Sequence, residues 1–351
     1  MRIGITCNLK DDLENLSPSL LPEDAAEEWD HSETIQAIQK SLQSAGHEVH
    51  LLGSGLEVIE KIKRLKIDFV FNLAEGFEGR NRESHIPAVL ELLGIPYSGS
   101  DPLGLAAALD KSFAKRIALS LGISTPDFWT AERKKDLASI PKNRYPLFVK
   151  PLWEGSSKGI RLSSRVNDPI ALEREFDRIF KDYSEQPVLI ESHISGREVT
   201  IGILGNQSPE VMGMMEIRFR DPQKKDFCYS LETKRNWREE VEYLVPPKLE
   251  KKVMNEVQTA ALNLFKALRL RDVARFDFRV DSKGTAYFLE VNPLPGLSPE
   301  SGDLVILASK KGIAYRELIL RILEAALNRY PELYKNVGAG LKPVPTRNLK
   351  S

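Results

Sequence analysis

The sequence predicts an N-terminal parallel α/β domain, a small central α+β domain and a C-terminal α+β domain. Three observations lead to this prediction. Strand and helix patterns alternate over the first hundred residues, the pattern changes after Asp110, and residues 273–292 read as two alternating strands joined by a short turn.

The length of the chain agrees with this division. At ~150 residues per domain, 351 residues allow two or three domains. The changes of pattern place the domains at 1–108, 109–205 and 206–335. Residues 336–351 are rich in glycine and proline, and we expect them to form a disordered tail.

In the first domain, short apolar strands at 3–7, 49–52 and 69–71 alternate with helical patterns that end at glycines. Such alternation predicts a parallel sheet with right-handed crossovers. Ligands of parallel sheets bind at the carboxyl ends of the strands. The irregular loop at 72–83 follows the third strand, so we expect it on the ligand side. We expect the polar stretch 8–28 to be a long loop.

The remaining chain mixes strands and helices in a different order. We expect strands at 147–150, 160–162, 188–191, 211–217 and 273–291, and helices up to 121, at 169–181, 248–268 and 314–329. Residues 221–242 are polar and read as a loop.

Composition excludes several classes of protein. Lys+Arg and Asp+Glu are both 50, so no net charge draws the chain to nucleic acid or anionic lipid. Two cysteines, Cys7 and Cys228, exclude a disulfide scaffold and a cysteine-based zinc site. No apolar run reaches the ~18 residues of a membrane span, and no signal peptide is recognisable. We therefore expect a cytoplasmic protein without nucleic-acid or membrane partners.

The most informative stretch is the strand pair at 273–292. Side chains alternate between the two faces of a strand. A turn at 281–284 would place Asp277 opposite Phe288 and Arg275 opposite Glu290. The polar face then carries Arg275, Asp277, Glu290 and Asn292. The core face carries Ala274, Phe276, Phe278, Val280, Tyr287, Leu289 and Val291.

The polar face of this hairpin could hold a metal. Two carboxylates and an amide suit Mg²⁺ or Mn²⁺, with phosphate oxygens and water as further ligands. A solvated strand face explains the alternation equally well. It does not explain the rigid Pro293-Leu294-Pro295-Gly296 turn that follows Asn292. The pattern therefore favours a metal site at Asp277, Glu290 and Asn292, and both interpretations stay open.

A second stretch, 150–159, could hold phosphate. Its glycines and serines would let successive backbone N–H groups surround an anion, and Lys150 would add a point charge. On its own, this segment is better explained as an ordinary flexible loop between strands. The chain lacks the Gly-x-x-x-x-Gly-Lys-Ser/Thr motif of P-loop proteins, and the glycines at 53 and 55 do not make a dinucleotide fingerprint.

Taken together, these segments resemble the ATP-grasp superfamily and, within it, the D-alanine–D-alanine ligase family. The resemblance runs from Ile67 to about Glu324, with the motifs in order. The segments that carry it are 92–100, Leu109-Asp110-Lys111, 147–151, 154–159, Ile190-Glu191, 196–200, Arg275-Phe276-Asp277 and 290–296. The resemblance implies a three-domain ATP-grasp fold, with the metal site in the C-terminal domain.

The resemblance also implies where ATP binds, namely between the central and C-terminal domains. Glu191 and the backbone at His193 and Ile194 would read the adenine edge, and Glu198 would hold the ribose. The implied ATP-binding residues are Lys111, Lys150, Glu154, Ser156, Ser157, Glu191, His193, Ile194, Glu198 and Lys234. Two Mg²⁺ ions, or Mn²⁺, would be held by Asp277, Glu290 and Asn292.

The implied reaction joins a carboxylate to an amine. The carboxylate attacks the γ-phosphoryl group to form an acyl-phosphate, and the amine then displaces phosphate to form an amide. Arg275 and the Gly296 N–H would stabilise the oxyanion, and the loop with Ser156 would close over the site. The family role of Lys234 is a phosphate contact. Ser301 would hold the carboxylate of the amine-bearing substrate.

Three departures from the family lie around the first substrate. Arg235 stands where the family has a tyrosine after Lys234. Glu75 stands near the position of a family His-Gly pair. The family's Gly-Gly-x-Ser-x-Glu opening is missing, and Glu28 is the nearest match to its amine-binding glutamate. We therefore expect an ATP-dependent amino-acid or peptide ligase whose substrates need not both be D-alanine.

Two other functions stay open. A related enzyme could use another nucleophile or stop at phosphoryl transfer, and a nucleotide-binding sensor could have lost catalysis. The retained charged residues argue against the sensor, because a sensor has no need of every group that phosphoryl transfer requires. The family is often dimeric, and the sequence neither supports nor excludes a homodimer.

Overall fold

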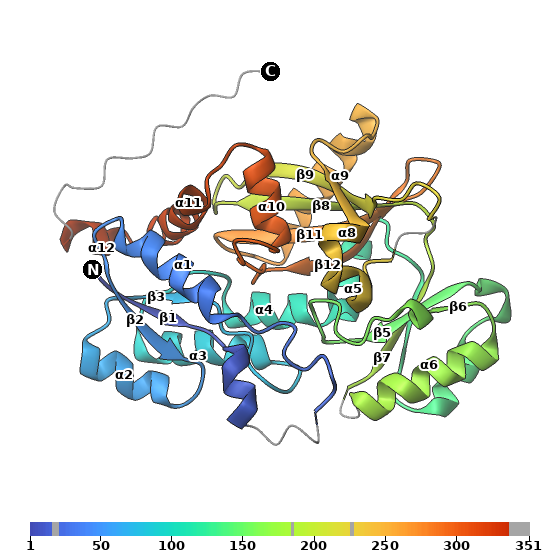
Figure 1. The fold of residues 1–351 in the computed structure, drawn as a ribbon, viewed down its shortest axis with the longest axis horizontal. Coiled ribbons are helices and arrows are strands. Elements are labelled where there is room, and N and C mark those ends of the chain that lie inside the picture. Colours follow the sequence, from blue (N-terminus) through green and yellow to red (C-terminus); the bar gives the residue numbers. More distant parts are fainter. Residues whose placement is uncertain (16–20, 184–185, 225–227, 337–351) are drawn as a thin grey trace.

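The structure, a computed structural model, describes residues 1–15, 21–183, 186–224 and 228–336. Of the tail expected at 336–351, all but the first residue lies outside these ranges. Figure 1 shows a three-stranded sheet in the blue N-terminal part, a four-stranded sheet in the green central part and a five-stranded sheet in the yellow and red C-terminal part. No helix in the described ranges is long and apolar enough to cross a membrane.

The N-terminal domain is the predicted parallel α/β unit. Its strands are β1 (Arg2–Thr6), β2 (Glu48–Gly53) and β3 (Phe69–Asn72), in the order β2-β1-β3. Its helices are η1 (Lys10–Asn15), α1 (Ser32–Gln43), α2 (Glu57–Leu65), η3 (Arg82–Ser84) and α3 (His85–Leu93). The loop after β3 leaves the carboxyl end of this sheet, the edge where parallel sheets bind ligands.

The central domain is an antiparallel sheet covered by one long helix. Its strands are β4 (Phe128–Ala131), β5 (Leu147–Pro151), β6 (Arg165–Val166) and β7 (Val188–Ser192), in the order β4-β7-β5-β6. Its helices are η4 (Lys134–Ser139), η5 (Lys142–Arg144), η6 (Leu162–Ser164) and α6 (Pro169–Asp182). The Asp168 side chain accepts a hydrogen bond from the Ala171 N–H and so starts α6.

The C-terminal domain is built on the five-stranded sheet β10-β9-β8-β11-β12. Its strands are β8 (Arg197–Leu204), β9 (Glu210–Phe219), β10 (Val241–Leu244), β11 (Val273–Val280) and β12 (Ala286–Asn292). The helices of this part and of the connection before the central domain are α4 (Pro102–Leu109), α5 (Lys111–Ser120), α7 (Leu231–Arg235), α8 (Trp237–Glu240), α9 (Lys251–Ala267), α10 (Asp303–Lys310), α11 (Tyr315–Leu327) and α12 (Pro331–Asn336).

Two hydrophobic cores join parts of the chain that are distant in sequence. In one, Ile38 of α1 and Ile5 of β1 pack with Ile322 of α11, so the C-terminal helices cover the N-terminal sheet (Figure 1). In the other, Ala114 of α5 packs with Phe276 of β11. The first core holds the five-stranded sheet beside the N-terminal domain, and the second holds α5 against that sheet.

Several elements differ from the prediction. Residues 160–162 form no strand, because the Ser164 Oγ accepts a hydrogen bond from the Arg161 N–H and turns the chain into η6. The polar stretch 221–242 contains α7 and α8, and Ser230 caps α7. Strand β8 lies before the predicted boundary at 205, yet it pairs with β9 and β11. We propose that the C-terminal domain begins with β8.

The hairpin of β11 and β12 has a different register from the one predicted. Asp277 lies opposite Glu290, and Arg275 lies opposite Asn292. A β-bulge between Asp277 and Phe278 shifts the pairing by one residue and so changes which side chains face the core. Phe288 is fully buried in the core. Leu289, which was expected there, lines a cavity instead.

Candidate active site

A large cavity lies between the central and C-terminal sheets. About 960 Å³ of space free of protein atoms lies within it, part of which is open to solvent. Apolar side chains such as Phe148, Ile194 and Leu289 line it together with charged groups such as Lys150 and Glu198. This first cavity can therefore enclose both an apolar ring and a charged group.

A second cavity adjoins the first on the side of the N-terminal domain. Its lining includes Glu28, Glu75, Glu83, Lys111 and Gly296. Gly155, Ser156, Arg275 and Glu290 line both cavities. A ligand in one cavity can therefore meet a ligand in the other at these residues.

The predicted metal ligands lie together where the two cavities meet. The Asn292 Nδ2 donates to Asp277 Oδ2 at 3.1 Å, and Glu290 lies opposite Asp277 in the ladder. Burial alone would raise the pKa of Glu290, but the positive charges of Lys111 and Lys150 outweigh burial and lower it to about 2. The carboxylate of Glu290 is therefore ionised and able to bind a cation.

This donor set fits a hard divalent cation that also binds phosphate. Among the described residues, no group of three or more His, Cys, Asp or Glu side chains could hold a metal ion alone. Two carboxylates and an amide would leave several ligand positions of Mg²⁺ to phosphate oxygens and water. Two cationic side chains lie next to these carboxylates. Lys111 Nζ lies 3.5 Å from Glu290, and Arg275 Nη2 lies 2.9 Å from Asp277.

Lys150 reaches the first cavity from β5 and is held there by a buried network. Its Nζ lies 2.9 Å from Glu191 Oε2, and Lys115 Nζ lies 2.5 Å from Glu191 Oε1. Lys115 is completely buried and also donates to the Thr125 hydroxyl and the Phe288 carbonyl at 2.9 and 3.2 Å. The carboxylate of Glu191, expected at the adenine edge, therefore pairs with two lysines and positions Lys150.

Lys115 was not among the predicted site residues, although its spacing from Lys111 could have indicated it. It follows Lys111 by one helical turn on α5, so both lysines face the same side. Lys111 Nζ donates to the Glu154 carbonyl and approaches Glu290. Lys115 lies deeper and contacts Glu191. This spacing could have indicated a paired cationic face.

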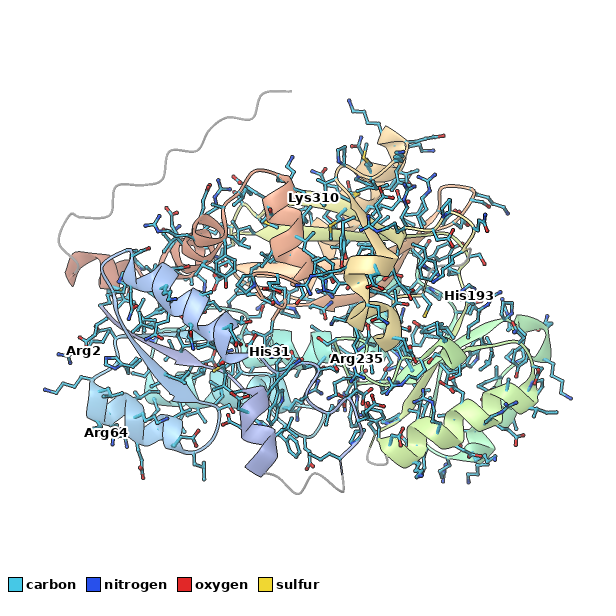
Figure 2. The ribbon with its side chains drawn as sticks, in the orientation of Figure 1. Arg2, His31, Arg64, His193, Arg235 and Lys310 are labelled. Carbon is cyan, nitrogen blue, oxygen red and sulfur yellow. The ribbon has the colours of Figure 1, made fainter. Side chains whose placement is uncertain are left out.

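The other residues expected around a nucleotide line the first cavity. His193 follows β7 directly (Figure 2), and Ile194 comes next. The Ile194 carbonyl accepts from Arg279 Nε at 3.2 Å, and Arg279 Nη1 lies 3.3 Å from Glu198. Burial raises the pKa of Glu198 to about 7. The contacts of His193, Ile194 and Glu198 with adenine and ribose stay predictions.

The Gly/Ser loop, residues 154–159, is closed over the boundary between the two cavities. Ser156 and Ser157 have left-handed φ angles of 50° and 64°, which bend the loop back on itself. Ser157 Oγ donates to the Tyr229 carbonyl at 2.7 Å and Gln186 Nε2 donates to Glu154 at 2.7 Å. The first contact ties the loop to the C-terminal domain, and the second ties it to the central domain from which it extends.

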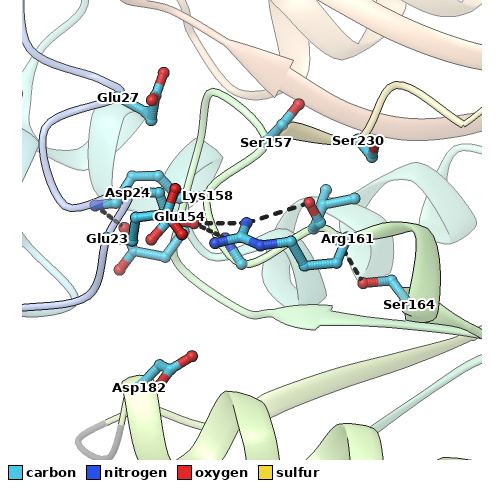
Figure 3. A network of polar contacts seen from close by, with 12 residues as sticks. Glu23, Asp24, Glu27, Glu154, Ser157, Lys158, Arg161, Ser164, Asp182 and Ser230 are labelled. Atoms are coloured by element: carbon cyan, nitrogen blue, oxygen red, sulfur yellow. Dashed lines mark hydrogen bonds and ion pairs between the residues drawn. The ribbon is translucent and has the colours of Figure 1, made fainter. Parts of the chain in front are cut away.

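An acidic segment of the N-terminal domain, residues 23–28, also holds this loop. Asp24 Oδ2 accepts from the Gly159 N–H and from Arg161 Nη1, each at 2.8 Å. Figure 3 shows Arg161 and Lys158 next to the acidic segment. This segment was expected to be part of a long loop at 8–28, but its role in anchoring the Gly/Ser loop was not predicted.

Glu28 also joins the acidic segment to the loop. Its carboxylate accepts from Arg82 Nη2 at 2.8 and 2.9 Å, from Lys158 Nζ at 3.1 Å and from the Gly155 N–H. Burial would raise the pKa of Glu28, but Arg82 and Lys158 lower it to about 2. Glu28, expected to bind the substrate amine, is thus already paired with two cations.

The α7 region separates two adjacent residues that the sequence analysis treated together. Lys234 lines the first cavity, where burial lowers its pKa. Arg235 (Figure 2) points to the surface, where Nη1 lies 2.5 Å from Glu23 and Nη2 lies 2.7 Å from Glu27. Arg235 lines neither cavity, so the structure lends no support to its expected substrate contact, which stays a prediction.

Ser301 does not reach the site, and a residue that the sequence analysis missed does. Ser301 is exposed and its Oγ bonds to Ser298 Oγ at 3.1 Å, so its expected contact with a substrate carboxylate gains no support and stays a prediction. Asp303, in the first turn of α10, is buried and lies 3.5 Å from Arg275 Nη1. The apolar run after Asp303 was the available signal for this helix.

Comparisons with known proteins agree over most of the chain. The family model for the D-ala D-ala ligase C-terminus matches residues 117–324. A D-alanine–D-alanine ligase of Aquifex aeolicus is 35% identical over 290 residues, which cover 83% of this chain and 93% of the relative. An uncharacterised protein of Sinorhizobium fredii is 33% identical over 318 residues, which cover 86% of this chain and 90% of the relative.

The fold has a counterpart among solved structures. The crystal structure of D-alanine–D-alanine ligase from Bacillus anthracis complexed with ATP matches with a TM-score of 0.73 and 26% sequence identity. The match covers 95% of this chain and 99% of that chain. The likeness therefore includes all three domains.

Proposed function

This chain belongs to the D-alanine–D-alanine ligase family of ATP-dependent ligases, and from this premise we propose which substrates it joins and which residues act on them. The substrates are ATP and two amino acids, which become linked by a peptide bond. The observation that carries the proposal is the meeting of the two cavities at Ser156, Arg275 and Glu290. A nucleotide in the first cavity would place its terminal phosphate beside a carboxylate in the second.

In the first half of the reaction, an oxygen of the substrate carboxylate bonds to the γ-phosphorus, and the bond between this phosphorus and the β-phosphate oxygen breaks. The products are ADP and an acyl-phosphate. Lys150 and Lys111 lie at the junction of the cavities, where they would neutralise the charge of the transferred group. The closed Gly/Ser loop would keep water from the acyl-phosphate.

In the second half, the amine nitrogen of the other amino acid bonds to the acyl carbon, and phosphate leaves with the breaking C–O bond. The attacking nitrogen loses a proton and an amide remains. Arg275 lines both cavities and Gly296 lines the second, so the guanidinium and the Gly296 N–H would stabilise the oxyanion that precedes this step.

Asp277, Glu290 and Asn292 would hold Mg²⁺ or Mn²⁺, with two ions expected. When bound, these ions neutralise negative charge on the phosphates. The donor set described above supports this assignment. The role of Lys234 as a phosphate contact is supported by its position in the first cavity.

The second cavity decides which amino acids bind. There Glu75 departs from the family pattern, and Glu28 pairs with Arg82 and Lys158. We propose that the amino acids need not both be D-alanine. The reaction consumes ATP, which supports a cytoplasmic location. A homodimer stays a prediction.

The test is phosphate release from Mg-ATP with D- and L-amino acids, given singly and in pairs, followed by mass spectrometry of the products. Glu290→Gln is the matched inactive control. A dipeptide supports the proposal, and D-alanyl-D-alanine would identify a cell-wall precursor ligase. A phosphorylated amino acid without dipeptide would replace ligation by phosphoryl transfer. Bound ATP without turnover for any pair would favour the sensor and overturn the proposal.

A further inference from the structure

Two glutamates of the second cavity, Glu75 and Glu83, form no direct ion pair with any residue that the structure describes. Glu83 is only 7% exposed, and both side chains line the cavity. Within the described ranges, neither carboxylate forms a hydrogen bond or an ion pair, whereas Glu28 beside them forms several. A buried, unpartnered carboxylate that faces a cavity is costly, unless a ligand binds it.

The backbone brings the two glutamates together and holds them there. Gly76 has a φ of +72°, and a Cβ added to it would lie 2.6 Å from the Arg82 carbonyl oxygen, so the two segments touch along the backbone. The Gly76 N–H donates to Asn8 Oδ1 at 3.0 Å, and its carbonyl accepts from Trp29 Nε1 at 3.3 Å. The pair is therefore part of a rigid wall.

The cations nearby are engaged elsewhere. Arg82 Nη1 donates to the Trp153 carbonyl at 2.6 Å, and its Nη2 binds Glu28. Lys158 also pairs with Glu28, and Lys111 approaches Glu290 at 3.5 Å. The cationic side chains around this cavity thus form their direct contacts with Glu28 and Glu290 and not with Glu75 or Glu83.

We propose that the ammonium group of the carboxyl-donating substrate binds between Glu75 and Glu83, while Glu28 serves to hold the Gly/Ser loop closed. This inference rests on the proposed function. It defines the first substrate as an amino acid with a free ammonium group. Carboxylic acids that lack the group, or carry it acylated, are excluded.

The electrostatics of the cavity agree with this assignment. Burial raises the pKa of Glu83 to about 7. Burial and then the charge of Glu83 raise the pKa of Glu75 well above its usual range. The charges of Arg82 and, at Glu83, of Lys111 only partly oppose these effects, so a bound ammonium group would lower both pKa values further.

The experiment compares each amino acid of the panel with its des-amino acid, for example D-alanine with propionate. Hydroxylamine is added to trap the acyl-phosphate as a hydroxamate. Removal of a charge-assisted hydrogen bond costs about 10- to 100-fold in affinity. We expect Glu83→Gln and Glu75→Gln to raise the KM for the first amino acid by about this factor. The ratio of kcat/KM for the amino acid to that for its des-amino acid should fall by the same factor. The KM for ATP should change less than about twofold, because neither residue lines the first cavity.

Glu28→Gln is the matched control, because it removes a carboxylate from the same cavity. We expect this variant to keep the wild-type preference for the amino acid over its des-amino acid. Thermal melts of the ligand-free proteins show whether a variant loses substrate binding alone or also loses stability of the fold. Glu83→Gln should melt no lower than wild type because it removes an uncompensated charge, whereas Glu28→Gln should melt lower.

Each outcome decides between the possibilities. Loss of preference in Glu28→Gln, with unchanged preference in the Glu75 and Glu83 variants, would overturn the inference and leave the proposed function intact. Equal trapping of propionate and D-alanine by wild type would overturn it as well. No hydroxamate from any acid with wild type would instead reject the proposed function.

Discussion

Arg82→Met tests whether the acidic segment holds the Gly/Ser loop closed. Arg82 joins these parts of the chain, since its guanidinium binds both Glu28 and the Trp153 carbonyl. The Arg82 and Glu28 side chains are only 2% and 5% exposed. Methionine keeps much of the apolar volume of arginine and removes the charge. We therefore expect both the acidic segment and the loop to open more often in this variant.

The magnitude follows from the burial of the pair. Loss of one partner of a buried ion pair costs about 3–5 kcal/mol, because the other charge stays buried. Lys158 Nζ at 3.1 Å and the Gly155 N–H still bind Glu28 in the variant, so the lower end applies. About 3 kcal/mol corresponds to a roughly 150-fold larger equilibrium constant for local opening.

Hydrogen exchange measured by mass spectrometry on peptides that cover 24–29 and 153–160 reports this opening. The matched control is Arg235→Met, which removes exposed ion pairs from the same acidic segment. Arg235 is 42% exposed, and surface pairs contribute about 0–1 kcal/mol, or less than about fivefold in exchange. If the exchange rate of these peptides rises no more in Arg82→Met than in Arg235→Met, the buried Arg82–Glu28 ion pair does not hold the loop closed.

Three further predictions concern single residues. Glu290→Gln should lower ATP turnover about 10²- to 10³-fold with an unchanged circular dichroism spectrum, because it removes a metal ligand and a charge at the reaction centre; near wild-type turnover would disprove the metal assignment. Ser301→Ala should change the KM for either amino acid less than about twofold, because Ser301 is exposed and contacts Ser298; a tenfold rise would restore its role in substrate binding. Gly76→Ala should destabilise the protein by about 1–3 kcal/mol, because its Cβ would strike the Arg82 carbonyl at a positive φ; an unchanged thermal melt would contradict that contact.

The fold class and the polar face of the hairpin were predictable because both depend on local periodicity. Alternation with a period of two identified Arg275, Asp277, Glu290 and Asn292 as one face, and the structure places them together. The residue opposite Asp277 in the hairpin was not predictable. A β-bulge places one extra residue in one strand, and the alternation of polar and apolar residues does not show where that residue lies. That bulge moved Phe288 into the core and Leu289 into the first cavity.

The roles of individual charged residues depended on partners that the sequence could not identify. Glu28 matched an amine-binding residue by its position before α1, yet Arg82, 54 residues further along the chain, pairs with it. Arg235 matched a substrate contact by its position after Lys234, yet it binds Glu27, 208 residues away. The first pair forms within the N-terminal domain and the second joins the N-terminal and C-terminal domains, so both depend on tertiary packing.

The sequence by itself determined the family, the three-domain architecture and the residues available for ATP, metal and phosphate. The tertiary structure alone decided which of the similar carboxylates near the second cavity form ion pairs and which face the cavity without one. The physical reason is that a carboxylate's role depends on its burial and on the cations within a few ångströms, and these cations come from distant segments. Glu28 found two such partners, and Glu75 and Glu83 were left facing the cavity.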